Sequence, residues 1–322
     1  MFEALKAART QILPCNPPFW ASTGHLQTIL GHLLPSPVLL ESGQELSIPL
    51  EHESECIHST YYKGSTTVAV YLFHGLGGSA EASYMQRTAM VARSFGYHVF
   101  INNHRGCGKG LGLASEPYHS GRAEDLSRVI EFGKQMLPHH YHVAIGFSLS
   151  ANALLLLSAG VRATVLPDAS IAVNGPIHLD HASIKLTQGL NRIYDKRFVL
   201  ELTNYIKENR PADVSKLERV KTLRDFDEAF TAVVGGFRSR NDYYETCSAK
   251  KYLKDIRIPT VLITAEDDPF VGVEDYKQAE LSASTILHIE KNGGHMGYLN
   301  QKGFGFERWL DSALKQYLQV FG

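Results

Sequence analysis

Short runs of β-branched and aromatic residues alternate with longer segments of helical spacing through the first half of the chain. Four of these runs are typical of buried strands: residues 67–73, 98–102, 141–145 and 169–173. Apolar positions recur at helical spacing in the segments between them: residues 84–95, 121–137 and 148–160. Strands alternating with helices of this length predict an α/β fold, a mostly parallel sheet covered by helices on both faces.

The alternation stops near Pro176, where a long segment of helical spacing and many charges begins. Strand patterns return only at residues 259–264 and 285–289, and a last helix is expected at 305–320. A helical insert between two blocks of strand–helix units predicts a helical cap, at residues 176–250, on a core formed by 55–175 and 251–322.

The segment before this core, residues 1–54, is expected to form an arm and a hairpin that pack on the core. The hairpin is expected to join strands at 38–41 and 45–50 through the turn residues Ser42 and Gly43.

Composition places the chain among ordinary globular enzymes. Of its 322 residues 44% are hydrophobic and 20% are charged, and the formal net charge is −1. This balance gives no overall field that would attract nucleic acid or an anionic membrane. No apolar run approaches the roughly 20 residues of a membrane span, and the four cysteines are widely spaced. We therefore expect a cytoplasmic protein with reduced thiols, no nucleic-acid partner and no integral membrane segment.

The segment Gly146-Phe147-Ser148-Leu149-Ser150 lies between an expected strand and an expected helix. This is the setting of the G-x-S-x-G nucleophile elbow, which predicts Ser148 as the nucleophile. Ser150 replaces the usual glycine but is still small. The Leu149 N–H would lie at a helix N-terminus, where it can stabilise an oxyanion. The alternative is that Ser148 only caps the helix.

A glycine-rich loop, His74-Gly75-Leu76-Gly77-Gly78, follows the first long apolar strand. Glycines let the backbone approach a ligand closely, and the Leu76 N–H is the expected second oxyanion donor. The competing interpretation is a phosphate-binding loop. It is disfavoured because the loop lacks both the Gly-Lys-Ser/Thr ending and the G-x-G-x-x-G spacing.

The expected acid and base follow two late strands, in the order of a Ser-Asp-His triad. Asp268 follows the strand at 259–264 and is the preferred acid, with Asp267 as the runner-up. His295 follows the last strand with glycines on both sides, and histidine can accept and return a proton near neutral pH.

At these residues the chain resembles the YheT-like branch of the α/β-hydrolase superfamily, also called the AB hydrolase 4 family. The matching motifs are Gly24-His25-Leu26-Gln27-Thr28, His74-Gly75-Leu76-Gly77-Gly78, Asn103-His104-Arg105-Gly106-Cys107, Tyr118-His119-Ser120-Gly121, the elbow, Asp242-Tyr243-Tyr244, Cys247-Ser248-Ala249, Asp267-Asp268-Pro269-Phe270 and Gly293-Gly294-His295. The resemblance implies a carboxylesterase or lipase, with acyl transfer to alcohols in some relatives. It maps the triad to Ser148, Asp268 and His295. Two positions depart from the family pattern: Ser150 stands for glycine and His104 for phenylalanine.

These observations predict a serine carboxylic-ester hydrolase that acts through an acyl-enzyme, with neither cofactor nor metal. Short- to medium-chain acyl esters or monoacylglycerols are the expected small-molecule substrates. The expected substrate contacts are His74, Gly75, Phe147, His104 and Tyr243. Two alternatives stay open: an alcohol O-acyltransferase that uses the same triad, and a non-catalytic ligand-binding scaffold. The sequence does not determine the acyl-chain length or the oligomeric state.

Overall fold

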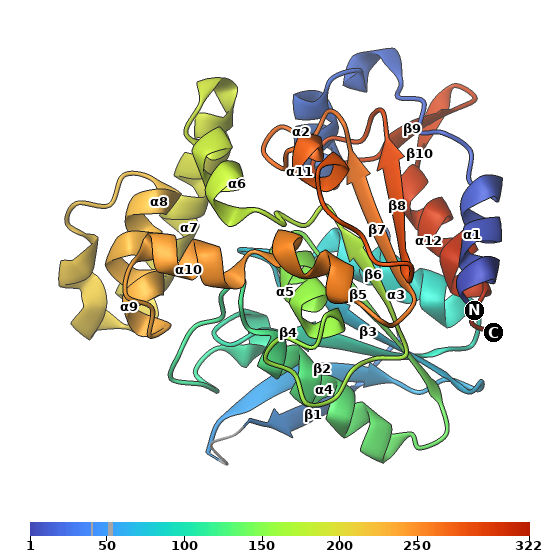
Figure 1. Ribbon diagram of the computed structural model, residues 1–322, viewed down its shortest axis with the longest axis horizontal. Coiled ribbons are helices and arrows are strands. Elements are labelled where there is room, and N and C mark those ends of the chain that lie inside the picture. Colours follow the sequence, from blue (N-terminus) through green and yellow to red (C-terminus); the bar gives the residue numbers. More distant parts are fainter. Residues whose placement is uncertain (40, 51–53) are drawn as a thin grey trace.

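The computed structural model describes residues 1–39, 41–50 and 54–322. Its main feature is an eight-stranded sheet in the order β1-β2-β4-β3-β5-β6-β7-β8, and a separate two-stranded sheet pairs β9 with β10 (Figure 1). The strands are β1 (Gln44–Pro49), β2 (Cys56–Tyr62), β3 (Val68–Phe73), β4 (His98–Asn103), β5 (Tyr141–Phe147), β6 (Ala169–Val173), β7 (Thr260–Ala265), β8 (Thr285–Glu290), β9 (Leu299–Lys302) and β10 (Gly305–Arg308).

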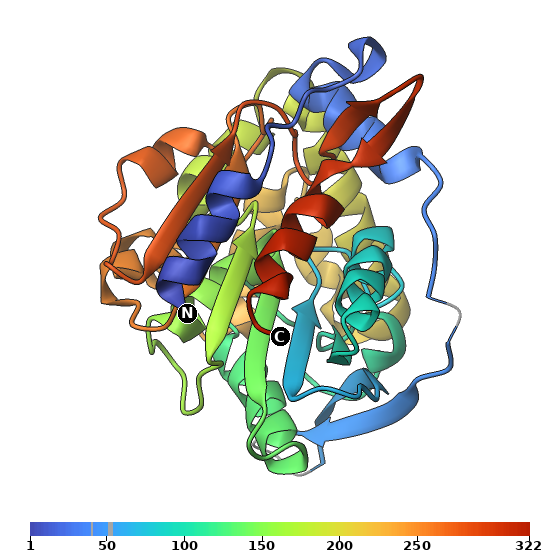
Figure 2. The same ribbon diagram turned by 90° about the vertical axis from the view of Figure 1, so that its right-hand side faces the viewer.

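The six neighbouring strands β4-β3-β5-β6-β7-β8 are parallel to one another. At the other edge of the sheet, β1 pairs with β2 and β2 pairs with β4 in antiparallel fashion. Every residue of β3 and of β7 is buried, as expected for parallel strands covered on both faces. The two faces carry separate hydrophobic clusters. Helices α1, α3 and α12 cover one face, which Figure 2 turns toward the viewer, and α4 and α5 cover the other.

The α-helices outside residues 176–250 are α1 (Phe2–Gln11), α2 (Gly24–Leu33), α3 (Ser83–Ser94), α4 (Ala123–Met136), α5 (Leu149–Ser158), α11 (Val273–Lys277) and α12 (Trp309–Gln319). The 3₁₀ turns are η1 (Phe19–Ala21), η2 (Gly108–Gly110) and η6 (Ala249–Asp255). No helix among the described residues combines the length and the apolar character that crossing a bilayer requires.

Residues 176–250 form a helical layer that projects from the sheet (Figure 1). Its elements are α6 (Leu179–Leu186), η3 (Gly189–Asn191), α7 (Arg192–Asn209), η4 (Pro211–Leu217), α8 (Leu223–Phe226), the π-helical turn η5 (Asp227–Thr231), α9 (Ala232–Val234) and α10 (Arg240–Cys247).

Two elements differ from the sequence-based expectation. The hairpin joins β1 to β2, with Gln44 opposite Tyr61, so the turn does not lie at Ser42 and Gly43. The expected strand at 38–41 is absent from its described residues, and Leu40 lies outside them. Residues 305–308 form β10 rather than the start of the last helix, which begins at Trp309. The sequence of β2, CIHSTYY, does not predict a strand because its polar residues interrupt the apolar pattern. The sheet nevertheless buries most of these polar residues.

Candidate active site

The backbone turns sharply at Ser148, between the end of β5 and the start of α5. Ser148 has φ 51° and ψ −118°, a conformation that a non-glycine residue adopts only under strong local constraint. The turn brings Gly146 so close to α5 that a Cβ at this position would lie 2.6 Å from the Ser150 carbonyl oxygen. This strand–turn–helix geometry is that of a nucleophile elbow.

The structure brings Ser148, His295 and Asp268 together from three distant segments. His295 Nε2 lies 2.9 Å from Ser148 Oγ, and His295 Nδ1 lies 2.8 Å from Asp268 Oδ2. Both distances are within hydrogen-bonding reach, as a hydroxyl, its base and the group that orients the base require. The arrangement can move the Ser148 proton to His295 while the buried carboxylate stabilises the imidazolium.

The Asp268 carboxylate is buried and fully engaged. Besides the His295 ring, Oδ2 accepts a hydrogen bond from Asn174 Nδ2 at 2.8 Å, and Oδ1 accepts from the Val271 and Phe270 amides at 2.9 and 3.1 Å. Burial alone would raise the pKa of Asp268, but the His295 ring and these donors outweigh it and hold that pKa below its ordinary value. The acid is therefore kept ionised.

Asn174, which sequence reasoning missed, supports this carboxylate from the end of β6. It is fully buried with φ 49°, and its Oδ1 accepts a hydrogen bond of 2.8 Å from Tyr298 OH. Its only sequence signal is a polar side chain directly after an apolar strand, at the edge where Ser148 and Asp268 also lie.

Asp267, the runner-up for the acid, does not contact the His295 ring. Its Oδ1 accepts a hydrogen bond of 2.8 Å from the Gly294 amide, next to His295 in the chain. On the other side of this loop, Thr28 Oγ1 of α2 accepts a hydrogen bond of 2.8 Å from the His295 amide. Asp267 and Thr28 thus hold the backbone that carries the histidine.

The two expected oxyanion donors, the Leu76 and Leu149 amides, flank Ser148 and line the same cavity. Neither amide donates a hydrogen bond within the described part of the chain, so both are available to a ligand. Gly75 permits this approach, because a Cβ there would lie 2.9 Å from Ser148 Cβ.

Ser150 and His104, the two departures from the family pattern, contact each other. Ser150 Oγ donates a short hydrogen bond to the His74 carbonyl and lies 2.6 Å from His104 Nε2, which must then donate to it. The His104 ring stacks on Tyr118 with centroids 4.6 Å apart, and Tyr118 OH donates to the Gly75 carbonyl at 3.0 Å. Burial lowers the pKa of His104 to about 4, so its ring is neutral near pH 7. These side chains anchor the glycine-rich loop on the elbow.

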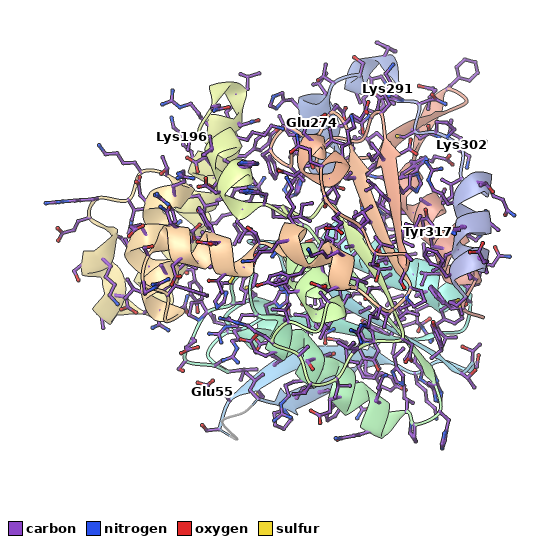
Figure 3. The ribbon with its side chains drawn as sticks, in the orientation of Figure 1. Glu55, Lys196, Glu274, Lys291, Lys302 and Tyr317 are labelled. Atoms are coloured by element: carbon purple, nitrogen blue, oxygen red, sulfur yellow. The ribbon has the colours of Figure 1, made fainter. Side chains whose placement is uncertain are left out.

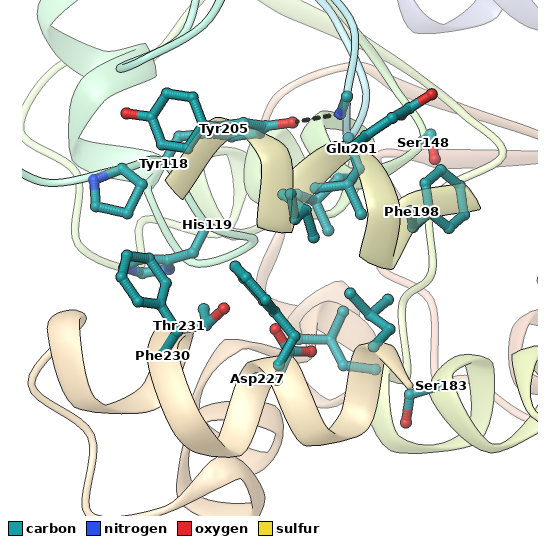
Figure 4. Close-up of a pocket in the computed structure, with 18 of the residues that line it drawn as sticks. Tyr118, His119, Ser148, Ser183, Phe198, Glu201, Tyr205, Asp227, Phe230 and Thr231 are labelled. Atoms are coloured by element: carbon teal, nitrogen blue, oxygen red, sulfur yellow. Dashed lines mark hydrogen bonds between the residues drawn. The ribbon is translucent and has the colours of Figure 1, made fainter. Parts of the chain in front are cut away.

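A cavity of about 300 Å³ opens at Ser148 and extends under the helical layer of residues 176–250 (Figure 4). Its lining is mostly apolar and includes Phe198, Leu202 and Phe230. Asp227, on the π-helical turn η5, also lines this cavity (Figure 4). Asp227 Oδ2 accepts a hydrogen bond of 2.6 Å from Tyr244 OH, and burial raises the pKa of Asp227 to about 6.

Of the five expected substrate contacts, the structure places only Tyr243 among the described residues that line this cavity. Phe147 ends β5 with its side chain in the core, 4.9 Å from the Tyr84 ring by centroids. Successive side chains of a strand point to opposite faces, so a residue beside Ser148 need not share its direction. His74 and His104 are buried in the network under the loop, and Gly75 contributes by lacking a side chain.

Comparison with known proteins agrees with this geometry. A family model described as the alpha/beta hydrolase fold matches residues 68–301. YheT of Escherichia coli (strain K12) is 29% identical over 78% of this chain and 76% of its own, and phospholipase ABHD3 of Mus musculus is 26% identical over 94% and 76%. The solved structure of the Pyrococcus furiosus esterase Pf2001 superposes with a TM-score of 0.58 and 17% identity, covering 89% of this chain and 98% of that one. The expected fold and the resemblance to YheT are confirmed: the chain belongs to the α/β-hydrolase fold family.

Proposed function

We propose that this protein is a serine carboxylic-ester hydrolase in which Ser148 is the nucleophile, His295 the general base and Asp268 the acid that orients it. The observation that carries the proposal is the unbroken path from Ser148 Oγ through the His295 ring to Asp268, with steps of 2.9 and 2.8 Å. A phospholipase among the similar proteins supports ester cleavage as the reaction.

In the proposed first step, His295 Nε2 takes the proton of Ser148 as Oγ attacks the ester carbonyl carbon. The Leu76 and Leu149 amides stabilise the oxyanion of the tetrahedral intermediate. The intermediate collapses to an acyl-enzyme as the alkoxide leaves with the proton from His295. Water then attacks the acyl-enzyme, with His295 again as base, and releases the carboxylic acid and free Ser148. No cofactor enters these steps.

We propose that residues 176–250 act as a cap and that the apolar cavity beneath them receives the acyl chain. About 300 Å³ is at the lower end of the range for small-molecule pockets, which supports short- to medium-chain esters or monoacylglycerols as substrates.

The test is the hydrolysis of p-nitrophenyl esters of increasing chain length by the wild-type protein and by Ser148→Ala. Ser148→Ala should lose at least roughly a thousandfold in kcat without unfolding, since the residual rate comes from binding and the oxyanion donors alone. Ser79→Ala, in the loop after the glycines, is the matched control and should keep wild-type kcat. Retained turnover in Ser148→Ala would refute the assignment, and ester products formed in added ethanol would identify an acyltransferase.

A further inference from the structure

Exposed large apolar side chains gather on the segments around the candidate active site. α2 presents three of them on one face, spaced as successive turns of a helix, and the start of α7 presents others. Phe19 in η1 is 88% exposed, and Phe304, in the turn between β9 and β10, is completely exposed. We call this surface the rim and define its apolar part as Phe19, Leu26, Ile29, Leu33, Leu190, Ile193, Leu200 and Phe304.

The segments of the rim are joined to one another. The Trp20 ring packs edge-on against Phe306 with centroids 5.8 Å apart, which joins η1 to β10. His25 Nδ1 lies 3.0 Å from Tyr194 OH, which joins α2 to α7. The segments η1 and α2 and the β9–β10 hairpin lie along the upper edge of the molecule in Figure 1 and again in Figure 2. These contacts hold the segments of the rim next to one another.

This surface borders the site of the proposed chemistry. Tyr194 of α7 packs on Phe270 with ring centroids 5.4 Å apart, and Phe270 packs on the His295 ring at 4.1 Å. Further along α7, Phe198 and Glu201 line the cavity. α7 thus carries exposed rim side chains on one face and cavity-lining side chains on the other, so the rim borders the cavity that holds Ser148.

The rim carries positive charge beside its apolar side chains. Arg192, Lys196 and Arg197 are exposed on the face of α7 that also presents Ile193 and Leu200. Arg197 pairs with Glu201 at 2.8 Å, whereas Arg192 and Lys196 form no ion pair with any described residue. Lys196 points away from the molecule in Figure 3. The formal net charge of −1 for the whole chain does not reveal this local excess.

We propose that the rim docks on an anionic lipid bilayer, with its apolar side chains inserted at the interface and its basic side chains at the headgroups. Apolar anchors flanked by Lys and Arg are the combination that binds membrane interfaces. Docking would then place the cavity, on the other face of α7, beside a source of ester lipid. The lipid as substrate rests on the proposed function, whereas docking itself does not require turnover.

The test measures co-sedimentation with vesicles of phosphatidylcholine alone and with vesicles of equal parts phosphatidylcholine and phosphatidylglycerol. The Ser148→Ala background is used throughout, so that no lipid is consumed. The protein should bind the anionic vesicles more tightly. Lys196→Gln should weaken that binding about fivefold, the effect of one basic side chain near an anionic surface, and leave binding to phosphatidylcholine unchanged. Ile193→Ser should weaken binding to both kinds of vesicle.

Two matched controls lie away from the rim. Val233→Ser removes an apolar side chain that is 57% exposed on α9, and Lys63→Gln removes an exposed charge directly after β2. Both controls should bind vesicles as the parent does.

Equal vesicle binding by Ile193→Ser, Lys196→Gln and the controls would overturn the proposal. So would a dimer, seen by light scattering, that Ile193→Ser dissociates without a change in vesicle binding, because the rim would then be an interface between two copies. In the active background, rim variants should hydrolyse water-soluble p-nitrophenyl acetate at the wild-type rate. Failure of the wild-type protein itself to hydrolyse p-nitrophenyl acetate would refute the proposed function and not the docking proposal.

Discussion

Replacing Ser150 by alanine removes the hydroxyl that joins the His104 ring to the His74 carbonyl. Both side chains are buried, and Ser150 Oγ lies 2.6 Å from His104 Nε2. A buried polar group left without a partner costs about 1–3 kcal/mol. His104 Nε2 keeps the His74 carbonyl as a second partner at 3.2 Å, so the penalty should not reach the upper end of this range. We therefore expect Ser150→Ala to lower the free energy of unfolding by about 2 kcal/mol.

His104→Phe keeps an aromatic ring for the stack on Tyr118 but removes the ring N–H. We expect a cost of about 1 kcal/mol, because Ser150 still donates to the His74 carbonyl. The double variant loses both ends of one hydrogen bond, so its cost should be less than the sum of the two single costs by about 1 kcal/mol.

The same variants should slow catalysis. The His74 carbonyl belongs to the loop that carries the Leu76 amide, and complete loss of an oxyanion donor costs about 3 kcal/mol. Loosening this anchor should lower kcat about tenfold and leave KM nearly unchanged, because the donor acts mainly in the transition state.

The assay combines urea unfolding with p-nitrophenyl acetate kinetics for the four proteins of the cycle. Ser158→Ala is the matched control: Ser158 is another buried serine of α5, and its hydroxyl bonds to the Leu154 carbonyl and to Ser170. It should lose stability but keep kcat. Additivity of the two single costs within about 0.3 kcal/mol, or an equal loss of kcat in Ser158→Ala, would refute the coupling.

Asn174→Ala removes a donor of 2.8 Å to the Asp268 carboxylate, so the pKa of Asp268, measured by NMR titration of its carboxyl carbon, should rise; an unchanged pKa would contradict this role. The pKa of Asp227 is raised to about 6, so its ionisation lowers the free energy of unfolding of the wild-type protein as pH rises from about 4 through 6. Asp227→Asn removes this ionisation and should raise the free energy of unfolding at pH 7–8 by about 1–3 kcal/mol. Thermal unfolding should show this gain vanish below pH 4, and a pH-independent gain would contradict it. Gly75→Ala places a Cβ 2.9 Å from Ser148 Cβ and should lower kcat on p-nitrophenyl acetate about a hundredfold without unfolding the protein. An unchanged kcat would show that the glycine-rich loop shifts to accommodate the Cβ and contradict the prediction.

The core strands could be predicted because each is encoded locally. The apolar runs at 67–73, 98–102 and 141–145 coincide with β3, β4 and β5 to within two residues. By contrast, β2 is buried through its pairing with β1 and β4, so no local apolar pattern marks it.

The residues of the site likewise fall into those that a local motif predicts and those that it does not. Ser148, Asp268 and His295 follow strands in short recognisable motifs, and the structure places the His295 ring within hydrogen-bonding distance of the other two. Asn174 has no such motif, because its place depends on partners 94 and 124 residues away in the chain. The direction of Phe147, into the core, follows from the pleat and not from its position beside the nucleophile.

The most direct test of the account is to locate the residue that a fluorophosphonate modifies, by mass spectrometry of the digested protein. The account predicts a single adduct on Ser148, formed by the wild-type protein and slowed at least roughly a hundredfold by His295→Ala, since the hydroxyl then lacks its base. An adduct on another residue, or an intact protein that does not react, would contradict the claim that His295 activates Ser148.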